Sequence, residues 1–280
     1  MKRKNIPQFF FDTADIDYIK RCWQTMLITG HFTGKEVVGI TTNPNAIAKV
    51  SCNDMVSFDR LVLELCKTVT TIRGDDEGVV YVQMPNSKMD PQMVVEFAKH
   101  VAMLSDDHTR VALKIPPFES ILKLTRMLQK KVDVNVTGVA DCATAMKCIT
   151  HEVNHVSVIP GRMEEVGIDA IRQVRFINQC NMKKTQIITG SMRTLAGLQW
   201  VIQEGTVPTI GSRVFDLVLA DGPEGIKAFK DLWSLEADPV DPEPFSPNVT
   251  DSMTHLSVSF FEQMDSLGQK LYEDYLSHKK

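Results

Sequence analysis

One lysine stands inside a short apolar segment, Val111–Ile115, in which it is the only polar residue. Successive side chains of a strand point to opposite faces, so Ala112 and Lys114 share one face. An ammonium group on a buried face is costly, and desolvation favours the neutral amine. A neutral lysine is a nucleophile that forms a Schiff base with a carbonyl substrate. The alternative is an edge strand whose lysine reaches water, which is the usual fate of lysine.

Other polar residues stand at or near the carboxyl ends of segments that are expected to be strands. Some have a second polar residue two positions earlier, as Thr137 has Asn135. Valines such as Val134 and Val136 occupy the intervening positions and suit a face covered by helices. Barrel enzymes place their catalytic residues at this end of several strands, so the pattern favours function over packing. The strand-end residues are Asp12, Asn43, Gln83, Lys114, Thr137, Ser157 and Ser191.

The segments that must position these residues alternate between short apolar runs and longer stretches of helical period. This alternation predicts right-handed crossovers and a parallel sheet. About eight such units in roughly 250 residues match a (β/α)8 barrel (TIM barrel) better than an open doubly wound sheet. The expected strands are Gln8–Asp12, Val38–Asn43, Val79–Met84, Val111–Ile115, Val134–Val139, His155–Ile159, Gln186–Ser191 and Val207–Ile210. The expected helices are Ile16–Leu27, Phe58–Ile72, Pro91–Leu104, Phe118–Gln129, Ala143–Thr150, Ile168–Gln179, Leu195–Glu204 and Ser212–Ala220.

The end of the chain is expected to form a separate extension. Residues 1–235 are assigned to the catalytic barrel, 236–249 to an acidic linker with four prolines, and 250–280 to a C-terminal helix. Apolar residues from Leu256 to Tyr275 recur mostly at three- and four-residue steps, which indicates one buried helix face. Two arrangements remain open: the helix packs on its own barrel, or it packs on a neighbouring subunit of a homo-oligomer.

Composition narrows the class of protein. A formal charge of −4 gives no electrostatic case for binding nucleic acid. No segment approaches the length of a membrane span, and Asp12 ends the only apolar run near the start too early for a signal peptide. The six cysteines are scattered without metal-site spacing, which suits reduced thiols. We therefore expect a cytoplasmic protein that binds neither nucleic acid nor membrane.

A zinc-site pattern, His-Glu-x-x-His, occurs at residues 151–155. The motif needs both histidines on one face of a helix. Here His155 opens a β-branched run, so the segment is expected to cross a turn between helix and strand. We expect two solvated loop histidines and no metal site.

Several segments together resemble the transaldolase family, which includes a fructose-6-phosphate aldolase-like subgroup. The matching motifs keep the family's order and spacing over roughly residues 8–235. Any one of them alone would be weak support. The segments are Phe-Phe-Phe-Asp-Thr-Ala at 9–14, Gly-Ile-Thr-Thr-Asn-Pro at 39–44, Val-Ala-Leu-Lys-Ile-Pro at 111–116, Asn-Val-Thr at 135–137, Pro-Gly-Arg at 160–162 and Gly-Ser-Met-Arg at 190–193.

The resemblance implies a role for each matching residue. Lys114 matches the Schiff-base lysine, and Asp12 the acid/base carboxylate. Gln83 and Thr137 match the pair that holds a water for carbinolamine dehydration. The resemblance also implies sugar-phosphate substrates and covalent catalysis without a cofactor. Asn43, Asn135 and Ser157 match residues that bind the donor's hydroxyl groups, and Arg162, Ser191 and Arg193 match a phosphate clamp.

Two departures from the family pattern favour different activities. Gln83 stands where transaldolases proper usually have Glu and the aldolase subgroup has Gln. Ile159 stands where transaldolases have Phe and those aldolases have Tyr, and Ile159 has no hydroxyl to assist imine hydrolysis. We therefore expect a transaldolase, with a fructose-6-phosphate aldolase as the alternative. An inactive sugar-phosphate-binding barrel and an interaction protein that uses its terminal helix are the alternatives outside the enzyme class.

Overall fold

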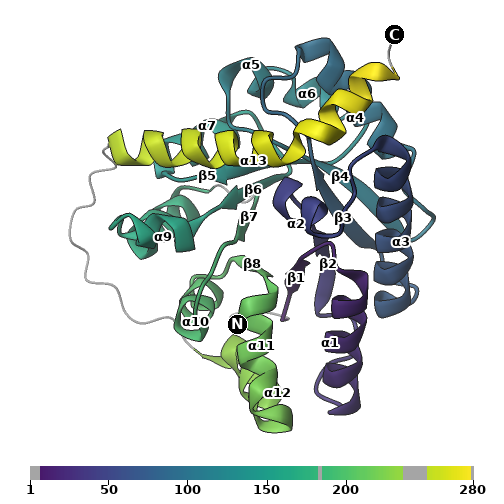
Figure 1. Ribbon diagram of the computed structural model, residues 1–280. Helices are drawn as coiled ribbons and strands as arrows, with labels where there is room; N and C mark the ends of the chain where they lie inside the picture. The colour runs from purple at the N-terminus through teal and green to yellow at the C-terminus, as the bar shows by residue number, and fades with distance from the viewer. Residues whose placement is uncertain (1–6, 182–184, 236–250, 279–280) are drawn as a thin grey trace.

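Eight parallel strands close into a barrel in the computed structural model, which describes residues 7–181, 185–235 and 251–278. Each strand pairs with its neighbours in chain order, and β1 pairs with β8 to complete the ring (Figure 1). The predicted (β/α)8 barrel is therefore confirmed. The strands are β1 (Phe9–Asp12), β2 (Val37–Thr41), β3 (Gly78–Gln83), β4 (Thr109–Ile115), β5 (Val134–Val139), β6 (His155–Val158), β7 (Gln186–Thr189) and β8 (Val207–Ile210).

Helices separate the strands along the chain and cover the outside of the barrel. Most begin at a residue whose side chain accepts a hydrogen bond from the first turn; Asp15, for example, accepts one from the Tyr18 amide at 2.9 Å. The helices are α1 (Ile16–Ile28), α2 (Pro44–Lys49), α3 (Met55–Arg73), α4 (Pro91–Ala102), α5 (Glu119–Leu122), α6 (Thr125–Leu128), α7 (Cys142–Thr150), α8 (Pro160–Glu165), α9 (Ala170–Cys180), α10 (Leu195–Gln203), α11 (Ser212–Ala220), α12 (Gly222–Asp231), the 3₁₀ turn η1 (Leu232–Ser234) and α13 (Asp251–Ser277).

The structure differs from the predicted helices in four places. α2 and α8 were not predicted, since each has only six residues and starts with a proline directly after a strand end. α12 was also missed. The predicted helix 118–129 is two four-residue helices, α5 and α6.

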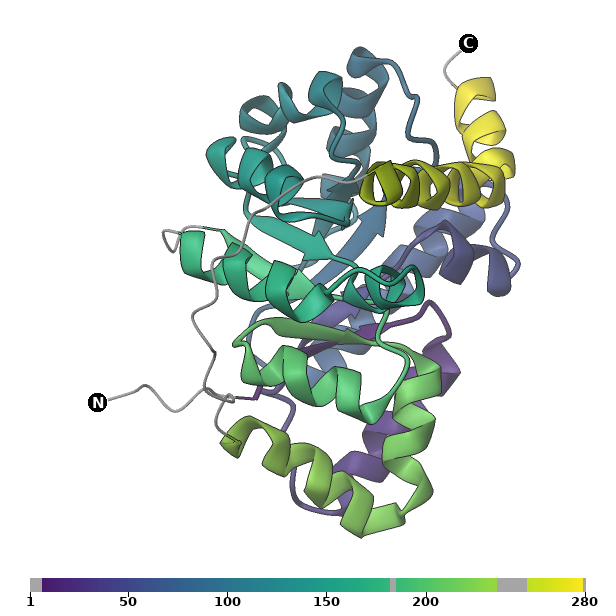
Figure 2. The ribbon, with the colours of Figure 1, turned by 90° about the vertical axis from the view of Figure 1, so that its left-hand side faces the viewer.

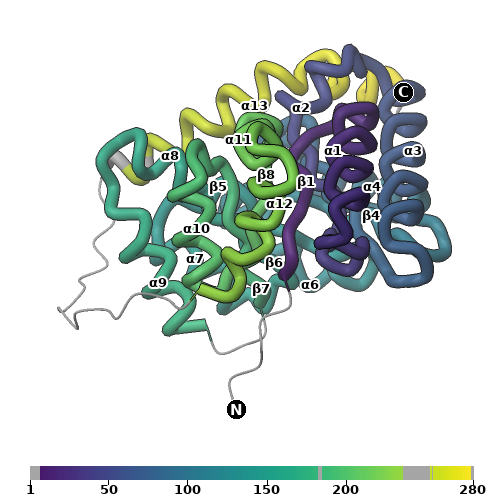
Figure 3. The backbone as a smooth tube through the Cα atoms, turned by 90° about the horizontal axis from the view of Figure 1, so that it is seen from below, coloured from purple at the N-terminus to yellow at the C-terminus, as the bar shows by residue number. Residues whose placement is uncertain are grey.

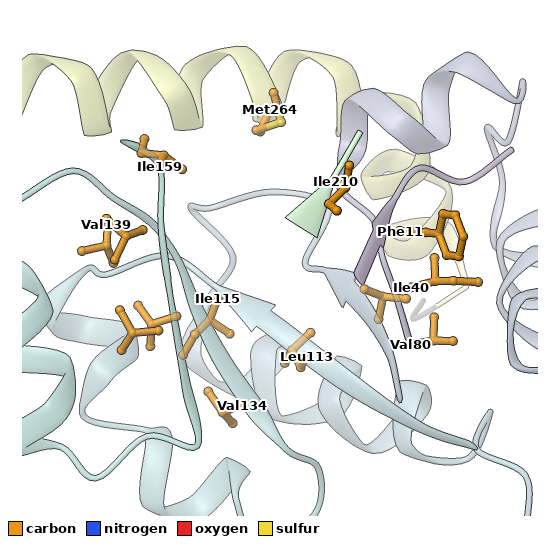
Figure 4. Packing of buried hydrophobic residues seen from close by; sticks show 14 of the residues in the cluster. Phe11, Ile40, Val80, Leu113, Ile115, Val134, Val139, Ile159, Ile210 and Met264 are labelled. Atoms are coloured by element: carbon orange, nitrogen blue, oxygen red, sulfur yellow. The ribbon is translucent and has the colours of Figure 1, made fainter. Parts of the chain in front are cut away.

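The two faces of each strand lie in different environments. Side chains such as Val80, Leu113 and Val134 face the helices and belong to the main hydrophobic core (Figure 4). A smaller apolar cluster fills the barrel interior; it consists of Phe10, Val79, Tyr81, Ala112, Ile188 and Val207. Because side chains alternate along β4, Ala112 in this cluster places Lys114 on the inner face as well. The closed barrel has no edge strand, so the edge-strand alternative for Lys114 is excluded.

The C-terminal helix α13 crosses the end of its own barrel at which the strands finish (Figures 1 and 2). Ser257 Oγ donates to the carbonyl oxygen of Gly138 in β5 at 3.0 Å. Seen from below, α13 passes α8 and α2 along one side of the molecule (Figure 3). The described chain therefore places the helix on its own barrel. The predicted linker at 236–249 lies outside the described residues, and the association of subunits stays a prediction.

No helix in the described part of the chain is both long enough and apolar enough to cross a bilayer. All six cysteines are free thiols.

We expect Gly39→Ala to destabilise the barrel strongly. A Cβ at Gly39 in β2 would lie 1.8 Å from the carbonyl oxygen of Val79 in β3, and neither backbone can move without breaking the ladder. The expected loss in the free energy of unfolding exceeds about 3 kcal/mol. Urea denaturation followed by circular dichroism measures it.

Gly30→Ala is the matched control, because Gly30 has φ +71° and open space around its Cβ position. Only the left-handed backbone is strained there, at a cost of about 1 kcal/mol. Equal losses for the two variants would contradict the steric account of Gly39.

Candidate active site

Lys114 projects into the barrel near the carboxyl end of β4 and is only 6 % exposed. Its Nζ donates to Thr41 Oγ1 at 3.0 Å and to the carbonyl oxygen of Thr42 at 2.9 Å. Both acceptors come from the end of β2. The amine is therefore held by neutral acceptors and is not in a direct ion pair, which leaves its charge weakly compensated.

Asp12 ends β1 and lines the same cavity as Lys114. Thr209 Oγ1 in β8 donates to Asp12 Oδ2 at 3.4 Å. The helix that follows is capped by Asp15 and not by Asp12. The Asp12 carboxylate is thus free to act on a bound molecule.

Burial shifts both groups toward their neutral forms. It lowers the pKa of Lys114 to about 8, although the negative charge of Asp12 opposes the shift. Burial also raises the pKa of Asp12, against the charge of Lys114 and the Thr209 hydrogen bond. At pH 7 about a tenth of Lys114 is then the neutral amine, compared with about 0.03 % for a lysine of ordinary pKa. The site therefore holds a nucleophilic amine near neutral pH.

Gln83 and Asn135 flank Lys114 on the neighbouring strands. In the strand register, Gln83 of β3 and Asn135 of β5 are both direct partners of Lys114. They are 2 % and 1 % exposed, and neither Gln83 Oε1 nor Asn135 Oδ1 has a hydrogen-bond partner among the described residues. Two buried acceptors beside an amine are suited to hold a water or a substrate hydroxyl.

A small inner cavity of about 40 Å³ opens onto Lys114. Thr137 of β5, Ser157 of β6 and Ile159 line it together with Asp12. Asn43 also lines it, but it lies beyond the end of β2, where a strand was expected to continue. Its Oδ1 caps α2 by accepting from the Ala46 amide at 2.9 Å, which fixes the side chain and leaves the NH2 group and one lone pair of Oδ1 for a ligand.

A wider outer cavity of about 490 Å³ leads from the inner one to the surface. Arg162 of α8, Arg193 and Ser191 line it. Ser191 lies beyond β7 rather than in it, with φ +63°, and Arg193 Nε donates to Glu165 Oε1 at 2.8 Å. The wall carries four cationic side chains and three carboxylates, which leaves the cations in excess. This excess is suited to an anionic group such as a phosphate. The cations are Lys49, Arg162, Arg193 and Arg213, and the carboxylates are Asp12, Asp15 and Asp216.

All ten predicted site residues therefore lie at the same mouth of the barrel. Eight of them line the two cavities, and Gln83 and Asn135 lie buried beside Lys114. The structure places these side chains together; their roles stay predictions.

Sequence reasoning missed several residues at this site. Lys49 and Arg213 line the outer cavity and add two positive charges to its wall. Thr41 was visible as a polar residue two positions before Asn43, but its contact with Lys114 depends on the neighbouring strands. Phe260 of α13 lines both cavities, which no local pattern indicates.

The His-Glu-x-x-His segment crosses a turn, as predicted: α7 ends at Thr150 and β6 begins at His155. The prediction of a solvated His155 was wrong. Its ring packs edge-on against Tyr81 inside the barrel, 5.4 Å between centroids, and burial lowers its pKa to about 4. Within the described residues, no three His, Cys, Asp or Glu side chains are grouped as a metal site.

Solved structures resemble this chain in fold at very low sequence identity. Thiamine phosphate pyrophosphorylase from Pyrococcus furiosus superposes with a TM-score of 0.55 at 9 % identity, over 82 % of this chain and 97 % of that one. Orotidine 5'-phosphate decarboxylase from Pyrococcus horikoshii gives a TM-score of 0.52 at 10 % identity, over 81 % and 100 %. These similarities concern the fold alone.

Proteins that are similar in sequence indicate the family more specifically than the similar folds do. A probable transaldolase of Thermodesulfovibrio yellowstonii is 29 % identical over 66 % of this chain and 77 % of its own. Probable transaldolases of Streptococcus pyogenes and Streptococcus agalactiae are 27 % and 28 % identical over 81 % of this chain and 98 % and 97 % of theirs. The profile of the transaldolase/fructose-6-phosphate aldolase family matches residues 9–241. The sequence around Phe260–Gln263, which also resembles the terminal helix of the smaller members, lies outside this match. With the match running through every strand of the barrel, the chain belongs to the transaldolase/fructose-6-phosphate aldolase family.

Proposed function

We propose that this protein is a transaldolase, which transfers a dihydroxyacetone unit from a ketose phosphate to an aldose phosphate through a Schiff base on Lys114. The observation that carries the proposal is the buried amine of Lys114, whose pKa is lowered to about 8, in a cavity shared with Asp12. The cation-lined outer cavity supports a phosphorylated substrate. The names of the relatives support the same reaction.

The first half of the reaction forms and uses an iminium ion. The neutral amine of Lys114 attacks the C2 carbonyl of fructose 6-phosphate or sedoheptulose 7-phosphate, and the carbinolamine loses its hydroxyl as water. A water beside Gln83 and Thr137 relays the proton that this loss requires. Asp12 then takes the proton from the C4 hydroxyl, the C3–C4 bond breaks, and its electron pair moves onto the iminium to give an enamine. From fructose 6-phosphate, glyceraldehyde 3-phosphate leaves.

The second half decides between the two candidate activities. When C3 of the enamine attacks the aldehyde carbon of an acceptor such as erythrose 4-phosphate, and water then hydrolyses the imine, the enzyme is a transaldolase. When a proton takes the place of the acceptor, the enzyme is an aldolase that releases dihydroxyacetone. Gln83 favours the aldolase, and Ile159, which lines the cavity without a hydroxyl, favours the transaldolase. Lys114, Asp12 and the arginines together argue against an inactive binding barrel.

Two further expectations belong to this proposal. A cytoplasmic sugar-phosphate enzyme of this kind fits the reduced thiols and the modest negative charge. Association into a homo-oligomer is also proposed. The C-terminal helix is a candidate for that contact, since it packs on its own barrel with one face and leaves Val258 and Leu267 exposed.

Borohydride trapping tests the covalent step. With fructose 6-phosphate as donor we expect a stable dihydroxyacetone adduct on Lys114 and none in Lys114→Arg, since a guanidinium does not form the imine. Peptide mass mapping locates the adduct. Lys49→Arg, which alters a lysine of the outer cavity, is the matched control and keeps the adduct. Absence of an adduct on every lysine would leave a sugar-phosphate-binding barrel as the better account.

The rate of trapping should follow the titration of Lys114. With dihydroxyacetone and cyanoborohydride, we expect the rate to rise about tenfold from pH 7 to pH 9 and then to level off, because the amine is fully neutral above its pKa. The Asp12 carboxylate raises the pKa of Lys114, so Asp12→Asn moves the inflection to lower pH. A rate that keeps rising beyond pH 10, or an inflection that moves upward in Asp12→Asn, would contradict the assigned electrostatics.

Dependence on the acceptor separates the two activities. For a transaldolase, erythrose 4-phosphate accelerates the continuous release of glyceraldehyde 3-phosphate at least about tenfold, because the enamine otherwise accumulates on Lys114. A coupled dehydrogenase assay follows the triose phosphate. Equal rates with and without the acceptor would identify an aldolase.

A further inference from the structure

The C-terminal helix contributes to the wall of the active site although it lies beyond the family match. The match ends at residue 241, and α13 begins at Asp251. Phe260 lines both the inner cavity around Lys114 and the outer cavity, and Met264 lines the outer one. In Figure 4, Met264 points from the helix toward the barrel, above the strand end that carries Ile159. Phe260 and Met264 therefore contribute to the cavity walls from outside the matched residues.

The same helix holds one of the cavity arginines. The guanidinium carbon of Arg162 lies 5.0 Å from the ring centroid of Phe260, which is a cation–π contact. Arg162 Nη2 donates to Gln263 Oε1 at 3.2 Å. Arg162 Nε is buried and has no hydrogen-bond partner among the described residues. One edge of the guanidinium is thus fixed by α13.

The side chain of Arg162 has fewer other contacts to hold it in place than that of Arg193. Arg193 is held by Glu165 at 2.8 Å, whereas Arg162 stands on α8, a helix of six residues, and no described carboxylate lies within salt-bridge distance of it. A long side chain on a short helix loses rotamer freedom when it binds an anion, and this loss weakens binding. A contact that already restricts the side chain removes part of that cost.

α13 is itself docked firmly enough to act as a support. Asp265 accepts from the amide and the hydroxyl of Ser87 at 2.6 and 2.7 Å, and Asp274 accepts from the Met55 amide at 2.7 Å. A Cβ at Gly268 would lie 2.1 Å from the carbonyl oxygen of Pro85, so the helix backbone approaches the loop after β3 closely. Together with the hydrogen bond from Ser257 to Gly138, these contacts lie on both sides of the segment that carries Phe260 and Gln263 and fix it on the barrel.

We propose that Phe260 and Gln263 are positioning residues of the active site, which orient Arg162 for binding the substrate's phosphate. The ring covers one face of the guanidinium and the amide holds its Nη2, which fixes the side chain of Arg162 in the wall of the outer cavity. The C-terminal extension thereby completes the phosphate-binding wall in the same chain. The identification of the anion as a sugar phosphate rests on the proposed function.

Binding of inorganic phosphate to the full chain tests this role directly. Isothermal titration calorimetry should show a dissociation constant about 3- to 10-fold higher in Gln263→Ala and in Phe260→Leu than in the unaltered protein, in the range of a lost cation–π contact or a hydrogen bond to a charged group. Ser266→Ala, which alters an exposed residue of the same helix, is the matched control and keeps the constant unchanged. Gln263 is exposed, so its substitution leaves folding intact even where Phe260→Leu does not.

A second readout separates positioning from a merely structural role. The KM for fructose 6-phosphate should rise by the same factor in both variants. In Gln263→Ala, whose residue does not line the inner cavity, trapping of unphosphorylated dihydroxyacetone on Lys114 stays at the rate of the unaltered protein. Unchanged phosphate binding in Gln263→Ala and in a folded Phe260→Leu, or no phosphate binding by the unaltered protein, would overturn the proposal. Failure of the proposed reaction shows separately, as absence of the Lys114 adduct while the phosphate measurement still stands.

Discussion

The burial of one ammonium group at the open end of a closed barrel is the constraint on which the site depends. The cost of desolvating the Lys114 ammonium is offset only in part. Its Nζ donates to the Thr41 hydroxyl and to the backbone carbonyl of Thr42, and the charge of Asp12 stabilises it further. A direct ion pair would have kept the amine protonated. Burial therefore lowers the pKa of Lys114 to about 8, against the weaker opposing effect of Asp12, and favours the neutral amine.

The rest of the barrel supports this arrangement in layers. An apolar cluster that includes Phe10, Tyr81 and Ala112 fills the interior around the middle of the strands and keeps water from reaching Lys114 from within. Gln83 and Asn135 lie beside the lysine as buried polar groups, and the cations of the outer cavity lie nearer the surface. Lys114 and the cations of the outer cavity thus lie at different depths of the barrel mouth. This separation suits the substrate of the proposed function, which has a carbonyl at one position and a phosphate at another.

The C-terminal helix covers part of this mouth. It lies beyond residue 241, where the family match ends, and yet places Phe260 in both cavities and Gln263 on Arg162. A helix that is tied to the barrel by Ser87, Met55 and Gly138 restricts access to Lys114 and orders one arginine at the same time. If the proposed function holds, access of the substrate and binding of its phosphate both depend on this helix.

The sequence alone determined the alternation of strands and helices and the barrel, because these follow from local periodicity. It also singled out, from family motifs near the strand ends, ten residues that the structure brings together at one mouth. It did not determine the contacts between strands far apart in the chain, such as Thr41 with Lys114 or Thr209 with Asp12. The short helices α2 and α8, the burial of His155 and the position of α13 were likewise settled by packing. Local sequence specifies which way a side chain points along its strand, whereas its neighbours, its solvation and hence its pKa depend on how the barrel closes.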